Sequence, residues 1–157
     1  MNPYLFPALE KGPDILRRLV QLVPPSRYDE RLDEDRFTFR EVLAHMADWE
    51  SIDLERLRAG VENGRAKIEG IDEWILAREQ NYASKNIEDC LNEYERGRHE
   101  TVRFLKSLTP EDWQKGIEHS ERGFMSTYDQ ANLIVGHDVY HFDQLTEYLM
   151  PKTTATW

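Results

Sequence analysis

The last segment of the chain, residues 128–150, has the apolar periodicity of an α-helix and carries two histidines on its inward side. Its inward stripe recurs at steps of three or four residues and consists of Ile134, His137, His141, Leu145 and Tyr148. Such steps trace one face of a helix. The acidic residues fall mostly on the remaining surface and are Asp129, Asp138, Asp143 and Glu147. The two imidazoles therefore occupy positions where leucines are expected, and they need partners inside the fold.

An earlier segment, residues 37–57, places a third histidine in the same way. Its inward stripe consists of Val42, His45, Trp49 and Ile52. Thr38 and Glu41 form a T-x-x-E capping box, which predicts that a helix begins there. A buried imidazole must satisfy two ring nitrogens, so three histidines on core faces call for a compensating partner. A divalent cation would supply it.

The spacing of these histidines fits a metal site. Two histidines four residues apart on a helix lie about 6 Å apart and can chelate one ion through bonds of about 2.0–2.1 Å. A third histidine from a neighbouring helix would complete one face of the metal's tetrahedral or octahedral coordination shell and leave a position open for another ligand. Alternatively, the H-x-x-x-H pair arises by chance, but three inward positions favour a metal site at His45, His137 and His141. Because the ligands must be neutral, metal affinity is expected to fall below about pH 6.

Two segments resemble the signature segments of the DinB-like superfamily. They are residues 37–50, FTFREVLAHMADWE, and residues 136–145, GHDVYHFDQL. The resemblance, which extends more weakly over nearly the whole chain, implies a four-helix bundle. In that family one histidine on the second helix and an H-x-x-x-H pair on the fourth bind a divalent metal, and His45, His137 and His141 fill these positions here. Gln144 also matches a recurrent family position, either as a hydrogen-bonding partner at the edge of the site or as a simple polar contact.

The resemblance also implies a chemistry. Characterised DinB-like proteins include S-transferases and an isomerase that use low-molecular-weight thiols such as bacillithiol or mycothiol, so a metal-dependent thiol S-transferase acting on a small molecule is expected. The alternatives are a metal-dependent hydrolase of the same fold and a non-enzymatic, metal-pinned stress-response protein. Three neutral histidines leave the ion its full charge, which can lower the pKa of a bound water or thiol. Zn or Ni is the expected metal, with Fe or Co as alternatives.

Further polar residues are weaker candidates for the site. Asp48 at i+3 and Glu41 at i−4 from His45 could reach the metal or orient His45, although exposed helix acids are the simpler interpretation. His119 lies in a predicted loop and is a candidate for the mouth of a pocket. No catalytic base is evident in the sequence, so no catalytic residue is assigned. The sequence contains no Gly-rich phosphate-binding loop, and an organic cofactor is therefore not expected.

Four long helices are predicted, over residues 8–23, 38–59, 86–108 and 127–150. Pro13 leaves the start of the first uncertain. Residues 60–85 are too long for a tight turn, so a crossover containing a short helix is expected. Another short helix is predicted at 109–113, and only residues around Ile117 and Phe124 resemble strands. The predicted fold class is therefore all-α, a four-helix bundle with a crossover between the second and third helices.

Composition limits the classes of function. A chain of 157 residues with 39% hydrophobic and 32% charged content suits one domain over residues 1–157. A formal net charge of −10 argues against nucleic acid or an anionic membrane surface as a partner. The charged runs 27–36 and 93–98 are interpreted as solvated surface. Family members often dimerise, so a homodimer is an expectation that the resemblance implies.

The sequence also indicates a location. No stretch approaches the roughly 18 apolar residues of a membrane-spanning helix, and the N-terminus lacks the basic region of a signal peptide. Cys90 is the single cysteine, which excludes an intramolecular disulfide, and its surroundings predict a helix residue rather than a nucleophile. The cytoplasm is the expected location.

Overall fold

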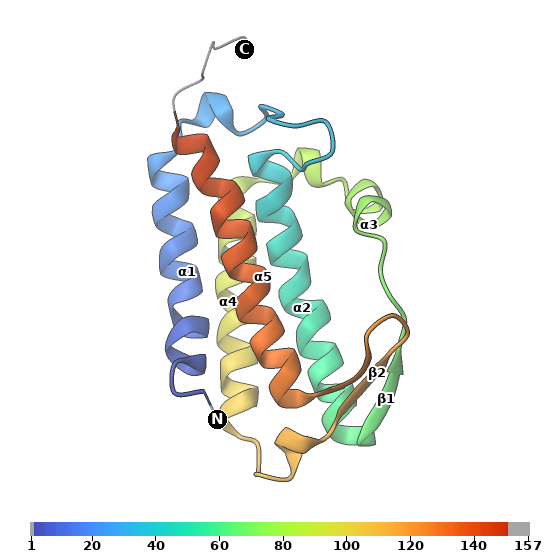
Figure 1. Ribbon diagram of the computed structural model, residues 1–157. Helices are drawn as coiled ribbons and strands as arrows, with labels where there is room; N and C mark the ends of the chain where they lie inside the picture. Colours follow the sequence, from blue (N-terminus) through green and yellow to red (C-terminus); the bar gives the residue numbers. More distant parts are fainter. Residues whose placement is uncertain (1, 151–157) are drawn as a thin grey trace.

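A computed structural model describes residues 2–150, and four long helices packed side by side form most of it (Figure 1). They are α1 (Leu5–Leu22), α2 (Phe39–Asn63), α4 (Ile87–Lys106) and α5 (Thr127–Thr146). The predicted bundle is confirmed, although α2 extends beyond the expected end at residue 59 and α5 gives way to a 3-10 turn, Glu147–Leu149. The predicted crossover is present and contains α3 (Glu73–Glu79). The single-domain prediction also includes residues 1 and 151–157, which lie outside the described range.

Side-chain caps explain where the helices begin. Thr38 accepts a hydrogen bond from the backbone N–H of Glu41, whose carboxylate accepts one from the N–H of Thr38. Ser126 and Asp129 form the same reciprocal pair at the start of α5. Asn86 caps α4. Each cap satisfies backbone donors that the first turn leaves without a partner. The helix starts are therefore determined by residues within a few positions of each start.

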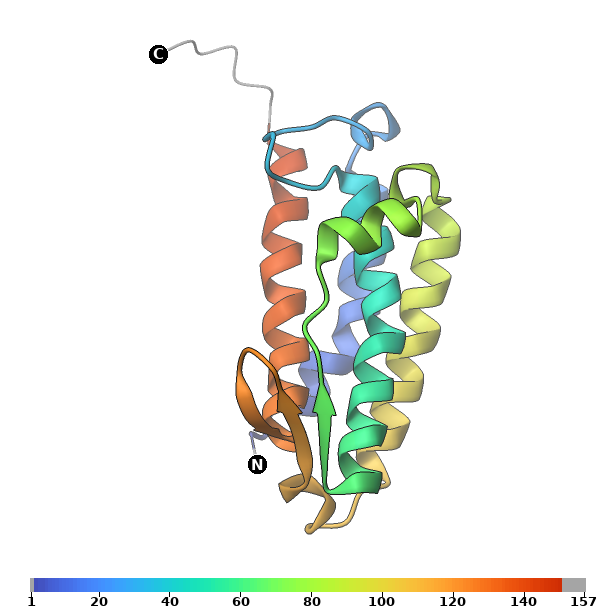
Figure 2. The same ribbon diagram turned by 90° about the vertical axis from the view of Figure 1, so that its right-hand side faces the viewer.

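The helices follow the order α1, α4, α2, α5 around the bundle, so that α1 and α2 lie diagonally opposite each other. Helices α1 and α5 run one way along the bundle, and α2 and α4 run the other way (Figure 1). The crossover after α2 makes this order accessible, because it returns the chain to the end where α2 began. Figure 2 shows the crossover running along the side where α2 and α5 are neighbours. The helix of His45 thus packs beside the helix of His137 and His141.

A small sheet at one end of the bundle is the main departure from the all-α prediction. It contains β1 (Arg65–Ile68), β2 (Gly116–His119) and β3 (Gly123–Ser126) in the order β1-β2-β3. The first pair is parallel, with Arg65 opposite Gly116, and the second is antiparallel, with Gly116 opposite Ser126. The sheet packs against α2 and α5. The short helix predicted at 109–113 is a 3-10 turn, Asp112–Gln114.

A polar layer at mid-height divides the apolar core of the bundle into two clusters. This layer contains the histidines and a buried ionic group of Glu50, Arg98 and Asp138. The sequence pattern indicates solvated surface for residues 93–98 and an outer position for Asp138. Both interpretations are wrong for the buried side chains of Arg98 and Asp138. Arg98 is fully buried because it lies on the inward stripe of α4, one turn after Tyr94. Within residues 2–150, no helix is long and apolar enough to cross a membrane.

Candidate metal centre

The three predicted histidines converge between α2 and α5. The Nε2 atom of His137 lies 3.0 Å from the Nε2 of His45 and 3.0 Å from the Nε2 of His141. All three candidate ligand atoms lie within 4.8 Å of one another. Metal–nitrogen bonds of about 2.0–2.1 Å place neighbouring ligands roughly 2.8–3.4 Å apart in an octahedral or tetrahedral shell. The three side chains could therefore hold one ion.

Hydrogen bonding among the imidazoles does not explain this arrangement. The Nδ1 of His141 lies 2.8 Å from Oε1 of Gln144, which can only accept. The hydrogen of a neutral His141 is therefore on Nδ1, and its Nε2 presents a lone pair to the centre. The Nε2 of His137 faces two other nitrogens, and one hydrogen can satisfy only one of them. A cation satisfies three lone pairs at once, so the donor set fits a metal, with Gln144 orienting one ligand.

Burial keeps these imidazoles neutral. Burial, and then the proximity of His141 and His137, lowers the pKa of His45 to about 2. Burial and then His141 lower the pKa of His137 to about 3. Burial also lowers the pKa of His141. Neutral imidazole is the form that binds metals. The lone pairs are therefore available near neutral pH without displacement of protons.

The second ring nitrogen of His45, Nδ1, is buried and has no hydrogen-bond partner among residues 2–150. Glu41, a candidate to orient it, closes the capping box and pairs with Arg31 instead. Asp48 acts on Tyr82, whose ring lies beside His45: burial, and then the charge of Asp48, raises the pKa of Tyr82. An N–H on a metal-binding histidine usually has an acceptor. Among the described residues, the Nδ1 of His45 therefore lacks the acceptor that the Nδ1 of His141 finds in Gln144.

Aromatic rings enclose His45. Their centroids lie 5.5 Å (Phe37), 5.7 Å (Trp49) and 6.4 Å (Tyr82) from that of His45. Trp49 also contacts His137 at 5.6 Å. His45 is fully buried, whereas His137 and Trp49 are partly exposed. The least buried side of the triad is therefore that of His137 and the Trp49 indole.

His119 is not part of the triad. It ends β2 rather than lying in a loop, and it is buried. Its Nδ1 accepts a hydrogen bond from the backbone N–H of Glu121 at 3.2 Å. It lines a separate cavity together with Asp53 and Arg56 of α2, which sequence reasoning did not single out. Their spacing could have indicated this position, because Asp53 lies four residues after Trp49 and Arg56 three residues after Asp53, which places all three on one face of the helix.

Comparisons with known proteins agree with this architecture. The sequence model of the DinB superfamily matches residues 8–145. A solved structure of YfiT from Bacillus subtilis, described as a probable metal-dependent hydrolase with an unusual four-helix bundle topology, is similar with a TM-score of 0.84. The two chains are 21% identical over 92% of this chain and 83% of that one, so the likeness shows the fold. A search among curated proteins gave no match.

Proposed function

The chain belongs to the DinB superfamily, and on that premise we propose that it binds one divalent metal ion at His45, His137 and His141 and transfers a low-molecular-weight thiol to a small electrophile. The observation that carries the proposal is the convergence of three Nε2 atoms, with that of His137 lying 3.0 Å from each of the other two and all three within 4.8 Å of one another. Zn or Ni is the proposed ion, with Fe or Co as alternatives, because imidazole ligands suit all four.

The proposed reaction forms one carbon–sulfur bond. When bound, a divalent ion held by neutral histidines supplies undiminished positive charge, which lowers the pKa of a thiol and polarises an electrophile. The thiol sulfur bonds to the electrophilic carbon, the leaving group departs with its bonding electrons, and the thiol proton passes to solvent. The aromatic wall of Phe37 and Trp49 suits an apolar electrophile, and the indole N–H of Trp49 has no partner among residues 2–150.

Two nearby carboxylates are engaged elsewhere, which supports a thiol over water as the nucleophile. Hydrolysis usually needs a general base within hydrogen-bonding reach of the attacking water. Glu41 is engaged in a capping box, and Asp138 is paired with Arg98 in the bundle interior. A thiol, with an ordinary pKa near 8.5, needs less help to ionise than water does. The absence of a free base at these two positions therefore favours the transferase.

A hydrolase is the second candidate. YfiT, which shares this fold, is described as a probable metal-dependent hydrolase. The carboxylate of Asp48 has no ion-pair partner in the described part of the chain and lies one turn from His45, so it could serve as a base. A small-molecule substrate is common to both candidates.

The transferase proposal includes a cytoplasmic location, because thiols are kept reduced in the cytoplasm. Cell fractionation tests this location.

The deciding experiment begins with protein purified without a nickel column. Elemental analysis should find about one divalent ion per chain, and light scattering of the same sample tests the proposed homodimer. Chlorodinitrobenzene with cysteine, glutathione, bacillithiol or mycothiol should give a conjugate that a chelator suppresses and added metal restores. Turnover of ester or amide substrates without thiol would favour the hydrolase. Bound metal with neither activity would favour the non-enzymatic alternative.

The fall in metal affinity below about pH 6 that unperturbed histidines predict should be much reduced, so the pH dependence of metal binding should be weak between pH 7 and 5. Three histidines with an unperturbed pKa near 6.5 would lose roughly 10⁴-fold in affinity over this range, because each must release a proton. In the folded chain the pKa values of His45 and His137, about 2 and 3, keep both neutral throughout. Competition with a chelator of known affinity should show a far smaller loss. A loss of the full 10⁴-fold would contradict the burial of the site.

A further inference from the structure

Beside the candidate metal centre, α2, α5 and the sheet enclose a second cavity of about 10 Å³, room for one small polar group. Its polar lining consists of Asp53, Arg56, His119, Arg122 and Gln130. The guanidinium of Arg56 lies 5.1 Å from the centroid of the Trp49 ring, whose other neighbours are His45 and His137. A single indole ring therefore separates this cavity from the triad.

The cavity presents hydrogen-bond donors that the protein does not use. Arg56 is 8% exposed, yet its only hydrogen bond within residues 2–150 runs from Nη2 to the carbonyl of Glu69 at 3.3 Å. His119 is 3% exposed, and because its Nδ1 accepts from Glu121, its hydrogen is on Nε2, which has no acceptor in that range. Among the described residues, the protein engages only one of these donors, the Nη2 of Arg56, so the others are available to a ligand. This arrangement favours an external acceptor.

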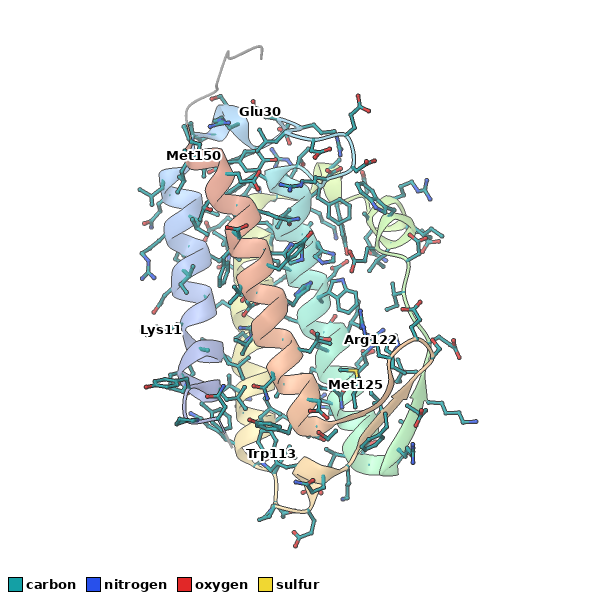
Figure 3. The ribbon with its side chains drawn as sticks, viewed as in Figure 1. Lys11, Glu30, Trp113, Arg122, Met125 and Met150 are labelled. Carbon is teal, nitrogen blue, oxygen red and sulfur yellow. The ribbon has the colours of Figure 1, made fainter. Side chains whose placement is uncertain are left out.

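The charge in the cavity is predominantly positive. Arg122 lies at the tip of the hairpin formed by β2 and β3 and makes no ion pair in the described part of the chain (Figure 3). Burial, and then the charges of Arg122 and Arg56, lowers the pKa of His119, so both guanidiniums act on this ring. The lining contains one carboxyl, Asp53, whose pKa is raised to about 7, first by burial and then by Glu50. Glu121 and Glu69 also act on His119 from outside the lining.

The cavity also contains acceptors without partners. Gln130 is 5% exposed, and its Oε1 has no hydrogen-bond partner among residues 2–150. Its Nε2 lies near the carbonyls of Met125 and Ser126, which fixes the orientation of the amide. Asp53 has neither a hydrogen bond nor an ion pair in the same range. These oxygens suit an N–H, or a water, on the ligand that the guanidiniums hold.

We propose that this cavity recognises a carboxylate on the small molecule whose reacting group lies at the triad. The inference rests on the proposed function of the triad and adds the chemical class of its ligand. Guanidinium groups match carboxylates through paired N–H donors. The small volume admits one carboxylate oxygen more readily than the oxygens of a phosphate, and the exposed Arg122 can cover the second oxygen. Carboxylate-bearing thiols or electrophiles are therefore the preferred ligands.

The first test follows binding directly at the cavity. The full chain, as purified, is titrated with glutarate, with neutral glutaramide as the matched control, while NMR records the Arg56 Nε–H and His119 ring signals. Glutarate should shift both signals saturably, and Arg122→Gln or Arg56→Gln should weaken binding about tenfold or more. Arg58→Gln, an exposed arginine on the same helix, should change nothing. Unshifted signals, equal effects of glutaramide, or tighter binding of inorganic phosphate would overturn the proposal.

The second test separates this proposal from the proposed function. Cobalt-loaded protein is titrated with thiol carboxylates from 3-mercaptopropionate to 6-mercaptohexanoate, each beside its neutral amide, and the cobalt absorption reports binding. At the length that reaches Arg56, the acid should bind about tenfold or more tightly than its amide, and Arg122→Gln should remove the difference. Equal binding of acids and amides at every length would contradict the cavity's role while leaving the triad intact. If no thiol changes the cobalt absorption, the transferase proposal is contradicted. The glutarate titration would then still test whether the cavity binds a carboxylate.

Discussion

Replacing His141 with alanine should produce a folded chain that no longer holds a divalent ion and has lost its metal-dependent activity. The substitution removes one of three converging nitrogens and the only contact between the triad and Gln144. The fold should survive because α2 and α5 are already held together by apolar residues above and below the polar layer. Metal binding adds roughly 3–4 kcal/mol at a hundred to a thousand times Kd, against about 5–15 kcal/mol for a domain of this size.

Three measurements on the same preparation check this expectation. Elemental analysis should show metal only in the parent, the conjugation assay should show loss of activity, and circular dichroism should show a modest fall in the midpoint of thermal unfolding. His99→Ala, which changes an exposed histidine of α4, is the matched control and should behave like the parent. A His141→Ala chain that is unfolded at room temperature would make the metal a structural pin. A metal-free variant as active as the parent would remove the metal from the chemistry.

The helices and the inward positions of the three histidines could be predicted because their signals are local. His45, His137 and His141 stand at helical steps among apolar residues, and a capping box such as that of Thr38 marks a helix start within four residues. The role of Gln144 was also foreseeable, since it lies at i+3 from His141 on the same helix. The meeting of His45 with His137 and His141 is not a local signal; that expectation rests on the inward position of all three histidines and on the resemblance to the DinB-like superfamily.

Strand β1 and the second cavity could not be predicted in this way. Residues 65–68 alternate too briefly to distinguish a strand from a loop, and they become a strand because β2, far along the chain, pairs with them. The cavity depends on that pairing, since it brings His119 and Arg122 beside Arg56 of α2. No spacing within a single segment encodes this arrangement.

Arg98 shows why the polar layer was also missed. A run of charged residues is usually interpreted as solvated surface, because a charge is buried only where it has partners. The partners of Arg98 lie on three other helices, so its own segment does not reveal them. Arg98 donates to Glu50 of α2 at 3.1 Å, to Asp138 of α5 at 2.6 Å and to the carbonyl of Leu9 in α1 at 3.1 Å. Pro13 has no N–H for that carbonyl, which frees it for Arg98. Gly12 allows the approach, because a Cβ there would lie 2.7 Å from Nη1 of Arg98.

Replacing Arg98 with methionine should therefore destabilise the protein strongly, by about 3–5 kcal/mol, because two buried carboxylates lose their counter-charge. Urea unfolding at pH 7 measures the loss, and Arg96→Met, an exposed arginine on the same helix, is the matched control, expected to change stability by no more than about 0.5 kcal/mol. Adding Glu50→Gln and Asp138→Asn to Arg98→Met should recover a large part of the loss. A loss in Arg98→Met no greater than in Arg96→Met would show that the ionic group contributes little.

The same variant should be less impaired at pH 5 than at pH 9. Burial is the main cause that raises the pKa of Glu50 to about 7, while Arg98 lowers it, so removing Arg98 raises it further. A carboxyl whose pKa is higher in the folded than in the unfolded chain favours folding at low pH, and this contribution is lost as the pH rises through the folded-state value. At pH 5 parent and variant both hold Glu50 in its neutral form, which needs no counter-charge, whereas above about pH 7 the parent ionises Glu50 beside Arg98 and the variant has no counter-charge for it. Urea midpoints of parent and variant at the two pH values give the comparison, and an equal loss at both would mean that Glu50 stays ionised without Arg98.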